Sequence, residues 1–329
     1  MSQTQIEVQN LEILSVNRLA DILRVPRERL VELEQFSRAL YKPFSLTKPL
    51  RPYQRKVSSR PRPIDNPIGC LKEVQKRINR ALLRPICFPE NVLGGVPKRS
   101  VLDNAQLHLG SSLLVTIDVK SCFPSITNAQ VYRVWRHFLG YSTPVASLLT
   151  ALTTYNRHLP QGAATSPLLA NLVMWMIDEP IRRACRERDV VYSTWIDDLA
   201  FSGGCARELI PISARVLQGE KLRISRSKIR IMGSRDVKLI TGARLGRDGV
   251  RAPKDKLLRI RSGIHKLGSE QMTSENQARF VKSLVAQLRY IDRLNPSDAG
   301  TLASHLLDVV KPSFTSTADL KFLKNKAER

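Results

Sequence analysis

The sequence predicts an α+β protein, with strands in the middle of the chain and an all-helical C-terminal part. A short β-branched-rich apolar run, from Leu113 to Ile117, is typical of a buried strand. Two apolar arms flank a polar Asp-Asp pair in VVYSTWIDDLAFSG, which predicts a hairpin with the acidic pair at its turn. After Pro253, basic and apolar residues alternate at helical spacing in three segments, near 253–267, 274–292 and 297–310.

The N-terminal part predicts helices around an extended basic stretch. Residues 15–38 predict two short helices whose apolar side chains form a stripe, and Pro26 opens the second helix. A DNA-reading helix pair would need a basic second helix, and this one is acidic, so a packing cap is favoured. Tyr41 to Arg62 is rich in Pro, Lys and Arg, which indicates extended segments, and a helix is expected from Leu71 to Ile86.

Strands and helices alternate in the middle of the chain. The strand that begins at Leu113 ends in Asp118. Helices are expected near Asn128 to Leu139 and from Thr165 to Arg188, and the run VKLITGARL predicts a last strand.

Charge restricts the partners. The 329 residues include 53 Lys and Arg against 29 Asp and Glu, a net charge of +24, which calls for a polyanion. The basic residues are spread along the chain without a lipidation signal, so nucleic acid is favoured over a membrane surface. The longest apolar stretch is too short to span a bilayer and the N-terminus is polar, so we expect a cytoplasmic protein. Its five cysteines form no CxxC pair, which indicates neither disulfides nor a zinc site.

Three carboxylates suggest metal chemistry. Asp118 ends a buried strand, and Asp197 and Asp198 lie at a hairpin tip, so neighbouring strands would bring them together. Two Mg²⁺ ions about 3.5–4 Å apart can activate an attacking hydroxyl and stabilise the leaving oxygen in phosphoryl transfer. Taken singly, each carboxylate could instead serve a turn or a cap.

Four sequence blocks in order resemble the palm of reverse transcriptases. They are DVKSCF, with Phe123 five residues after Asp118, then HLPQG, WIDD and GEKLRISRSK. The resemblance implies a right-hand polymerase with fingers, a ferredoxin-like palm of antiparallel sheet plus helices, and an all-helical thumb. The expected domains are an N-terminal helical cap (1–40), fingers (41–110), the palm with a fingers segment near 140–160 (111–250), and an RNA-binding thumb (251–329).

The resemblance also implies site residues. Asp118, Asp197 and Asp198, with the carbonyl of Val119, would hold two Mg²⁺ ions, for which Mn²⁺ is a possible substitute. Phe123 would exclude a 2′-hydroxyl from the incoming deoxynucleoside triphosphate, although it could also be plain core. The other implied nucleotide contacts are Gln161, Gly162, Lys228, Arg62, Lys98 and Arg99. Lys228 lies in so basic a run that a solvated lysine is an equal alternative.

Two further blocks resemble bacterial retron reverse transcriptases. DNAQLH contains Asn104 and His108, and ITG contains Thr241 and Gly242. Retrons imply RNA-directed synthesis of multicopy single-stranded DNA from a structured noncoding RNA. They also imply priming from an RNA 2′-hydroxyl, a branched RNA–DNA product, and antiphage defence with a separate effector protein. Asn104 and His108 could alternatively satisfy backbone groups in a loop. RNA contacts are also expected from Lys254, Lys256, Arg259, Arg261 and Lys266, which could otherwise form a solvated face.

Departures from the family pattern leave alternatives open. The usual Tyr-Ala before the Asp pair is Trp195-Ile196 here, and a histidine common near Leu93 and Gly94 is replaced. Neither change removes a metal ligand. The alternatives are a reverse transcriptase of another bacterial lineage (intron-encoded, CRISPR-associated or abortive-infection type) and a noncatalytic RNA-binding relic of a polymerase.

Overall fold

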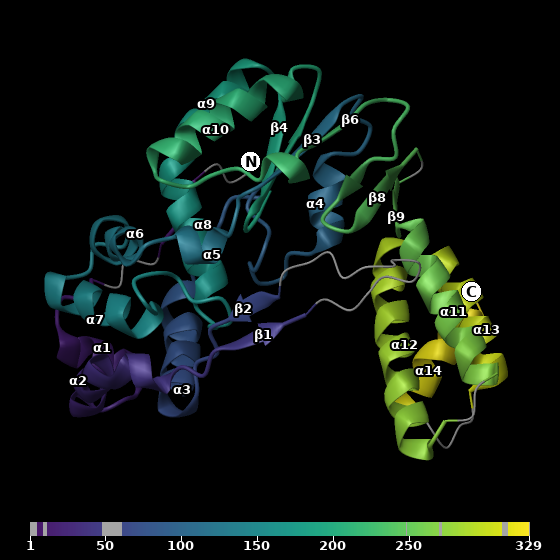
Figure 1. The fold of residues 1–329 in the computed structure, drawn as a ribbon, viewed down its shortest axis with the longest axis horizontal. Helices are drawn as coiled ribbons and strands as arrows, with labels where there is room; N and C mark the ends of the chain where they lie inside the picture. Colours follow the sequence, from purple (N-terminus) through teal and green to yellow (C-terminus); the bar gives the residue numbers. More distant parts are fainter. Residues whose placement is uncertain are drawn as a thin grey trace. The chain divides into compact units, whose positions relative to one another are not determined.

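The structure is a computed structural model that describes residues 5–8, 12–47, 61–247, 249–269, 272–310 and 315–328. It divides into two compact units (Figure 1). The first unit combines Met1–Arg99 with Val115–Ile231, and the second combines Ser100–Leu114 with Met232–Arg329. Helices and antiparallel strand pairs occur in both, which confirms the predicted α+β class.

The first unit begins with two predicted helices, α1 (Val16–Leu23) and α2 (Arg27–Phe36). The Ser15 hydroxyl caps α1 by accepting a hydrogen bond from the Arg18 amide at 3.2 Å. The apolar stripe of the pair is buried, and it packs against α3 (Gly69–Ile78) and α7 (Thr143–Thr153).

A short antiparallel hairpin, β1 (Phe44–Leu46) with β2 (Arg62–Ile64), precedes α3. Residues 48–60, most of the predicted basic stretch, lie outside the described residues. Helix α3 continues as a π-helical turn over Asn79–Leu83 and stops before the predicted Ile86. Pro85 accounts for this, since proline lacks the backbone N–H and disfavours helical backbone at the preceding residue.

The centre of the first unit is a four-stranded sheet of order β4-β5-β3-β6. Its strands are β3 (Leu114–Asp118), β4 (Val191–Trp195), β5 (Asp198–Ser202) and β6 (Arg230–Met232). The inner strands carry fully buried side chains such as Val115, Ile117 and Phe201. Strands β4 and β5 are antiparallel, with Trp195 opposite Asp198. Strand β3 is therefore the direct neighbour of the strand that starts at Asp198.

The same unit contains further helices. They are α5 (Cys122–Ser125), α6 (Asn128–Arg133), α8 (Ser166–Ile177), α9 (Glu179–Glu187) and α10 (Leu209–Gly219). Helix α9 contacts β4, and α10 packs along α9 (Figure 1). The single helix predicted from Thr165 to Arg188 is wrong. The chain leaves the helix at Asp178, and α9 restarts with Pro180 in its first turn, where a missing N–H costs nothing.

The second unit joins α4 (Val101–Leu107) to a three-stranded antiparallel sheet and four helices. The strands are β7 (Leu239–Ile240), β8 (Ala243–Gly246) and β9 (Gly249–Arg251). The helices are α11 (Lys254–Ser269), α12 (Ser274–Leu294), α13 (Pro296–Val309) and α14 (Thr317–Ala327). The single strand predicted over VKLITGARL is wrong, because the chain reverses at Thr241 and Gly242, which have positive φ angles of 45° and 83°. Helix α14 was not predicted.

Candidate active site

The sheet brings the three predicted carboxylates to adjacent positions. Asp118 is the last residue of β3, Asp198 is the first residue of β5, and Asp197 lies in the two-residue turn before β5. The amide of Val119 donates a hydrogen bond to the Asp197 carbonyl at 2.8 Å, which ties the end of β3 to the turn. The acidic pair is split, since only Asp197 belongs to the turn and Asp198 is already in the strand.

The hairpin turn is strained and tightly enclosed. Ile196 has a φ of 58°, a left-handed conformation that is uncommon for a β-branched residue. Gly94 lies directly against it: a Cβ on Gly94 would sit 2.6 Å from the Ile196 nitrogen and 2.7 Å from the Trp195 carbonyl carbon. The buried Asn171 amide donates to the Gly94 carbonyl at 2.7 Å, so α8 fixes the segment that supports the turn.

Burial and mutual repulsion raise the pKa values of Asp197 and Asp198. Burial, followed by the neighbouring Asp197 and Asp118, raises the pKa of Asp198 to about 6. Burial also raises the pKa of Asp197, and the charge of Asp118 adds to that shift. Lys228 offsets part of this repulsion, because its ammonium group lies 2.7 Å from Asp118 Oδ2.

A divalent cation fits this donor set chemically. Asp118 Oδ1 is buried and has no hydrogen-bond partner among the described residues. A bound cation would give this oxygen a partner and would lower the repulsion that raises the pKa values of Asp197 and Asp198. Within the described ranges, no group of three or more His, Cys, Asp and Glu side chains is already gathered for a metal ion. In this arrangement the Lys228 ammonium supplies the positive charge at Asp118.

The predicted nucleotide residues of the palm belong to the same unit. Phe123 lies half-buried in α5, which begins four residues after Asp118 and packs against α8. Gln161 and Gly162 form the loop before α8, with Gly162 at a φ of 134°. Its backbone approaches β2 so closely that a Cβ on Gly162 would lie 3.0 Å from Ile64 Cγ2.

The three predicted basic residues of the fingers differ in their surroundings. Arg62 is exposed on β2 and lowers the pKa of Asp197 through its charge, so it lies within electrostatic reach of the carboxylates. Lys98 is exposed at a positive φ of 65°. The Arg99 guanidinium donates to the carbonyls of Phe88, Pro89 and Val92. Arg99 therefore holds a loop together, and a phosphate contact would compete with these bonds.

The predicted RNA contacts Asn104 and His108 are buried in the second unit, 1% and 0% exposed. Neither side chain is exposed for a direct contact with RNA in this structure, and the RNA-binding role of the two residues stays a prediction. Burial lowers the pKa of His108 to about 4, so its ring is neutral at pH 7. The Asn104 amide donates to the Thr241 hydroxyl at 3.2 Å. The two blocks thus meet, and Asn104 supports the turn that exposes Gly242.

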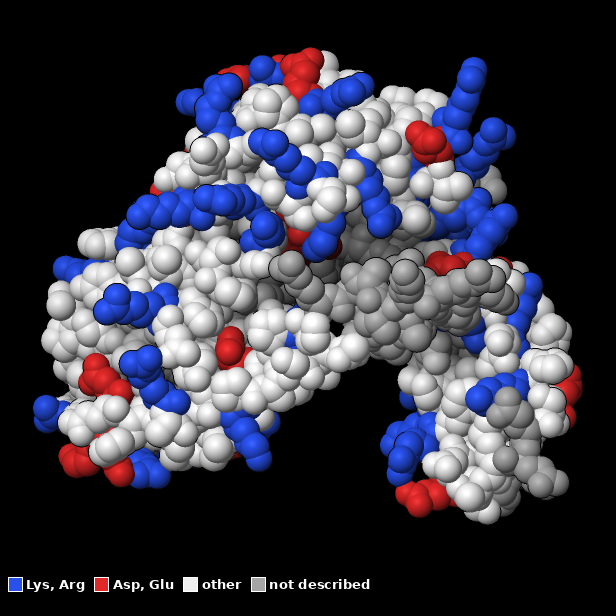
Figure 2. All heavy atoms as spheres, in the orientation of Figure 1, with Lys and Arg blue, Asp and Glu red and all other residues white. Residues whose placement is uncertain are grey.

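The basic residues of α11 fall into two groups. Lys254, Arg261 and Lys266 are exposed. Arg259 pairs with Asp255 at 2.5 Å. Lys256 is half-buried, 4.0 Å from the centre of the Tyr290 ring and 3.5 Å from the Gly242 carbonyl, and burial lowers its pKa. Lys256 therefore ties the Gly242 turn to α12, whereas Lys254 and Arg261 are exposed to solvent. Figure 2 shows Lys and Arg side chains across the visible face, with few Asp and Glu between them.

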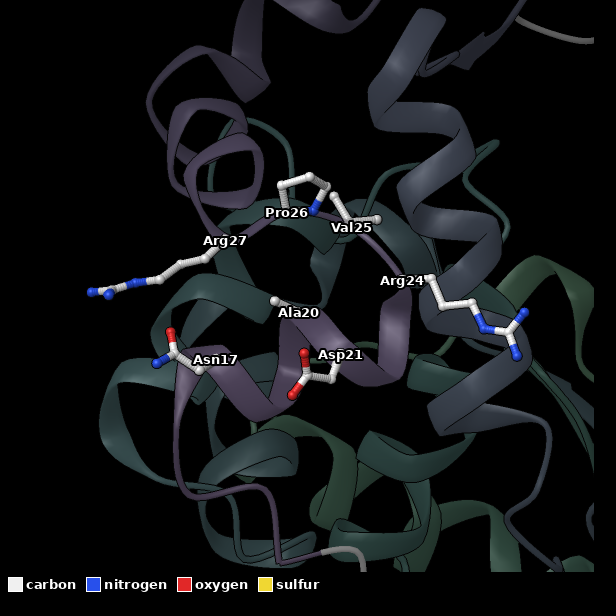
Figure 3. A pocket seen from close by; sticks show the side chains of 7 residues that line it. All are labelled: Asn17, Ala20, Asp21, Arg24, Val25, Pro26 and Arg27. Atoms are coloured by element: carbon white, nitrogen blue, oxygen red, sulfur yellow. The ribbon is translucent and has the colours of Figure 1, made fainter.

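A surface pocket of about 480 Å³ opens where α1 meets α2 (Figure 3). Asp21 and Asn17 border it, while the side chains of Arg24 and Arg27 point away to either side (Figure 3). None of the predicted site residues lines this pocket, and it offers a single carboxylate. It supplies no catalytic group.

Across the described part of the chain, we find no helix with the length and apolar character needed to cross a membrane.

The fold is that of a right-hand nucleic-acid polymerase. A family model described as reverse transcriptase (RNA-dependent DNA polymerase) matches residues 54–245. The chain belongs to this family.

Within the family, the chain is similar to bacterial retron enzymes. It is 32% identical to the retron Ec86 reverse transcriptase of Escherichia coli over 211 residues, 63% of this chain and 65% of that protein. It is 29% identical to the retron Mx65 reverse transcriptase of Myxococcus xanthus over 254 residues, 71% of this chain and 58% of that protein. The matches thus span 58% to 65% of these relatives. A foamy viral protease-reverse transcriptase structure in complex with RNA/DNA hybrid matches 88% of this chain and 33% of its own, with 13% identity and a TM-score of 0.46.

Several residues at the site were not identified from the sequence. Gly94 and Asn171 support the hairpin turn, and Asp65 and His158 contact the Gln161 loop. Asp65 and His158 are 93 positions apart, so no local spacing could have joined them. Gly94 lies in a Gly-Gly pair, a turn signal whose spatial neighbour is visible only in the fold.

Proposed function

We propose that the chain is an RNA-directed DNA polymerase that works in a retron. The observation that carries this proposal is the placement of Asp118, Asp197 and Asp198 at the adjoining ends of β3 and β5, beside Lys228. A pair of bound Mg²⁺ ions would supply Lewis-acid activation of the primer hydroxyl and stabilisation of the leaving pyrophosphate. The three carboxylates, with the Val119 carbonyl, are the proposed ligands, and Mn²⁺ could substitute.

The other palm and fingers residues would select and orient the nucleotide. Phe123 would lie under its sugar, and Gln161 and Gly162 would border its base and the template. Arg62 and Lys98 would neutralise triphosphate charge, and Lys228 would release Asp118 and face the departing pyrophosphate. Arg99 is a weaker candidate for a phosphate contact because its donors already bind carbonyls.

The similarity to retron enzymes supports a finer proposal about substrate and product. The template would be a structured noncoding RNA, primed from one of its own 2′-hydroxyls, and the product would be a branched RNA–DNA hybrid. A separate effector protein would act with this product in antiphage defence. The turn at Thr241 and Gly242, supported by Asn104, and the exposed face of α11 are the proposed RNA contacts.

Sequencing the nucleic acid that copurifies with the protein tests this proposal directly. A DNA strand joined to RNA through a 2′–5′ linkage, removable by a debranching enzyme, is the expected result. Linear DNA products in a Mg²⁺-dependent primer-extension assay would point instead to a reverse transcriptase of another bacterial lineage. RNA binding without any extension would point to a noncatalytic relic.

Phe123→Ala is expected to increase ribonucleotide incorporation relative to deoxyribonucleotides by about tenfold or more. The smaller side chain opens space under the sugar and so removes the steric exclusion of the 2′-hydroxyl. Steric discrimination of this kind contributes roughly 1–3 kcal/mol in enzyme pockets. Competing dNTP and rNTP in single-turnover extension measures the ratio. Unchanged discrimination in a soluble, active variant would assign Phe123 to the core.

Replacing Lys254 and Arg261 by Gln is expected to weaken RNA binding and to flatten its salt dependence. Binding releases about one counterion for each phosphate contact. The slope of the logarithm of the binding constant against the logarithm of the salt concentration should therefore become shallower by about one unit for each contact that is lost. Filter binding of the copurifying RNA over a salt series measures both quantities. Arg183→Gln with Arg186→Gln on α9 is a control of equal charge change, because these residues already pair with Glu187 and Glu179. Equal effects of the two double variants would place the RNA site elsewhere.

A further inference from the structure

We propose that Asp65 and His158 are positioning residues that lock the backbone of Gln161 and thereby set the affinity for the incoming nucleotide. The proposal rests on the proposed function, in which Gln161 and Gly162 border that nucleotide. It adds two residues to which the sequence assigned no role and that the fold joins across 93 positions.

Asp65 satisfies both backbone polar groups of Gln161. The Asp65 amide donates to the Gln161 carbonyl at 2.8 Å, and Asp65 Oδ2 accepts from the Gln161 amide at 3.1 Å. The contact resembles a rung of a β-ladder in which a carboxylate oxygen replaces one backbone carbonyl. A hydrogen bond to an ionised group is about twice as strong as a neutral one, so this rung holds the loop firmly.

His158 contacts the same carboxylate oxygen. Its Nε2 lies 3.3 Å from Asp65 Oδ2, and the Asp65 and His158 side chains are only 13% and 23% exposed. His158 is itself fixed, because its amide and carbonyl bond to Tyr155 at 2.9 and 2.8 Å. The Tyr155 ring stacks on Tyr41 with centroids 4.3 Å apart. The loop is thus anchored to the packed body of the first unit.

Gly162 leaves the loop no room to move toward β2. A Cβ there would lie 3.1 Å from the Asp65 carbonyl oxygen, so the two backbones are in close contact. The hydrogen bond between Asp65 and Gln161 and the close approach of Gly162 to Ile64 and Asp65 tie the strand that carries Arg62 to the loop before α8. A nucleotide that contacts both would meet a site already in its bound geometry, which lowers the cost of binding.

The test compares Asp65→Ala, Asp65→Asn and His158→Phe in the full chain. Asparagine keeps the acceptor oxygen and the size but removes the charge, and phenylalanine keeps the ring but removes the donor. For Asp65→Ala we expect the KM for dNTP to rise about tenfold or more while kcat changes by less than about threefold, with a smaller rise for Asp65→Asn. The Asp65→Ala and His158→Phe effects should be clearly less than additive in the double variant, because both act through one oxygen.

Hydrogen exchange gives a readout that does not depend on catalysis. Without nucleotide, the peptide that contains the Gln161 amide should exchange about tenfold faster in Asp65→Ala than in the original chain. Asp236→Ala is the matched control, since Asp236 Oδ2 accepts from the Gly233 amide at 2.8 Å in the other unit. It should change neither the KM nor exchange at Gln161.

The outcomes separate this inference from the proposed function. A chain that makes no DNA before any substitution would overturn the proposed polymerase activity. The hydrogen-exchange result would still report on the contact between Asp65 and the Gln161 backbone. An active chain in which Asp65→Ala leaves the KM for dNTP unchanged would overturn the positioning role. So would a fall in kcat alone, with normal exchange at Gln161.

Discussion

Asp198→Asn is expected to abolish DNA synthesis and, at the same time, to stabilise the metal-free protein at neutral pH. The loss of synthesis follows from the proposed metal role, and Asp197→Asn should show the same loss. The gain in stability follows from burial, which raises the pKa of Asp198 from 3.8 to about 6 in the folded chain. A carboxylate with a raised pKa destabilises the fold once it ionises, so the penalty grows between pH 4 and pH 6 and persists above.

The magnitude and sign are measurable by thermal unfolding over pH 4 to 7 in a chelating buffer. At pH 7 the variant should gain up to about 3 kcal/mol in unfolding free energy, and the difference should shrink as the pH falls toward 4. Mg²⁺ should reduce this difference in unfolding free energy, because it should bind and stabilise the unsubstituted chain alone. Asp236→Asn, at an exposed position, is the control. Full activity in either Asp→Asn variant would rule out the metal assignment, and equal stability at every pH would rule out the electrostatic argument.

Gly94→Ala is expected to reduce the rate of synthesis by about a hundredfold or more. The added Cβ would overlap the backbone of Trp195 and Ile196 at 2.6–2.7 Å, contacts that no side-chain rotation can relieve. The hairpin turn must therefore shift, and a displacement of about 1 Å at a catalytic group can cost about a hundredfold in rate. Single-turnover extension with saturating dNTP measures this loss.

Gly204→Ala is the matched control, because a Cβ at Gly204 has no neighbour within 4 Å among the described atoms. It should retain the rate and the melting temperature of the original chain. If Gly94→Ala is folded and extends primers normally, the turn tolerates displacement and the support by Gly94 has no catalytic importance.

The strand and the hairpin that carry the candidate carboxylates could be predicted because their signals are local, and the metal role followed from the resemblance to reverse transcriptases. A strand that ends in Asp118 and a hairpin around Asp197 and Asp198 are each visible within about a dozen residues, and the fold class follows from such periodic segments. The same local rule failed at Thr241 and Gly242, where a reversal of the chain interrupts an apolar run. It also failed at Pro180, where a break lies inside a helical pattern.

The supporting contacts could not be predicted because they join distant segments. Asn104 meets Thr241 across 137 positions, and Asp65 meets the Gln161 amide across 96. A basic composition likewise does not distinguish a guanidinium that binds phosphate from one that binds carbonyls. For Arg99 the second role appears only when Phe88, Pro89 and Val92 are placed around it.

The sequence alone predicted the α+β class and a polyanionic partner, because composition and short-range periodicity carry that information, and it predicted the three carboxylates through four blocks that resemble the palm of reverse transcriptases. Only the tertiary structure decided which groups hold those carboxylates and the Gln161 loop in place, and which expected contacts are buried. Burial and hydrogen bonding depend on the path of the whole chain through space. They assign Asn104 and His108 to the interior, Asp65 to the Gln161 amide and Gly94 to the hairpin turn at Ile196.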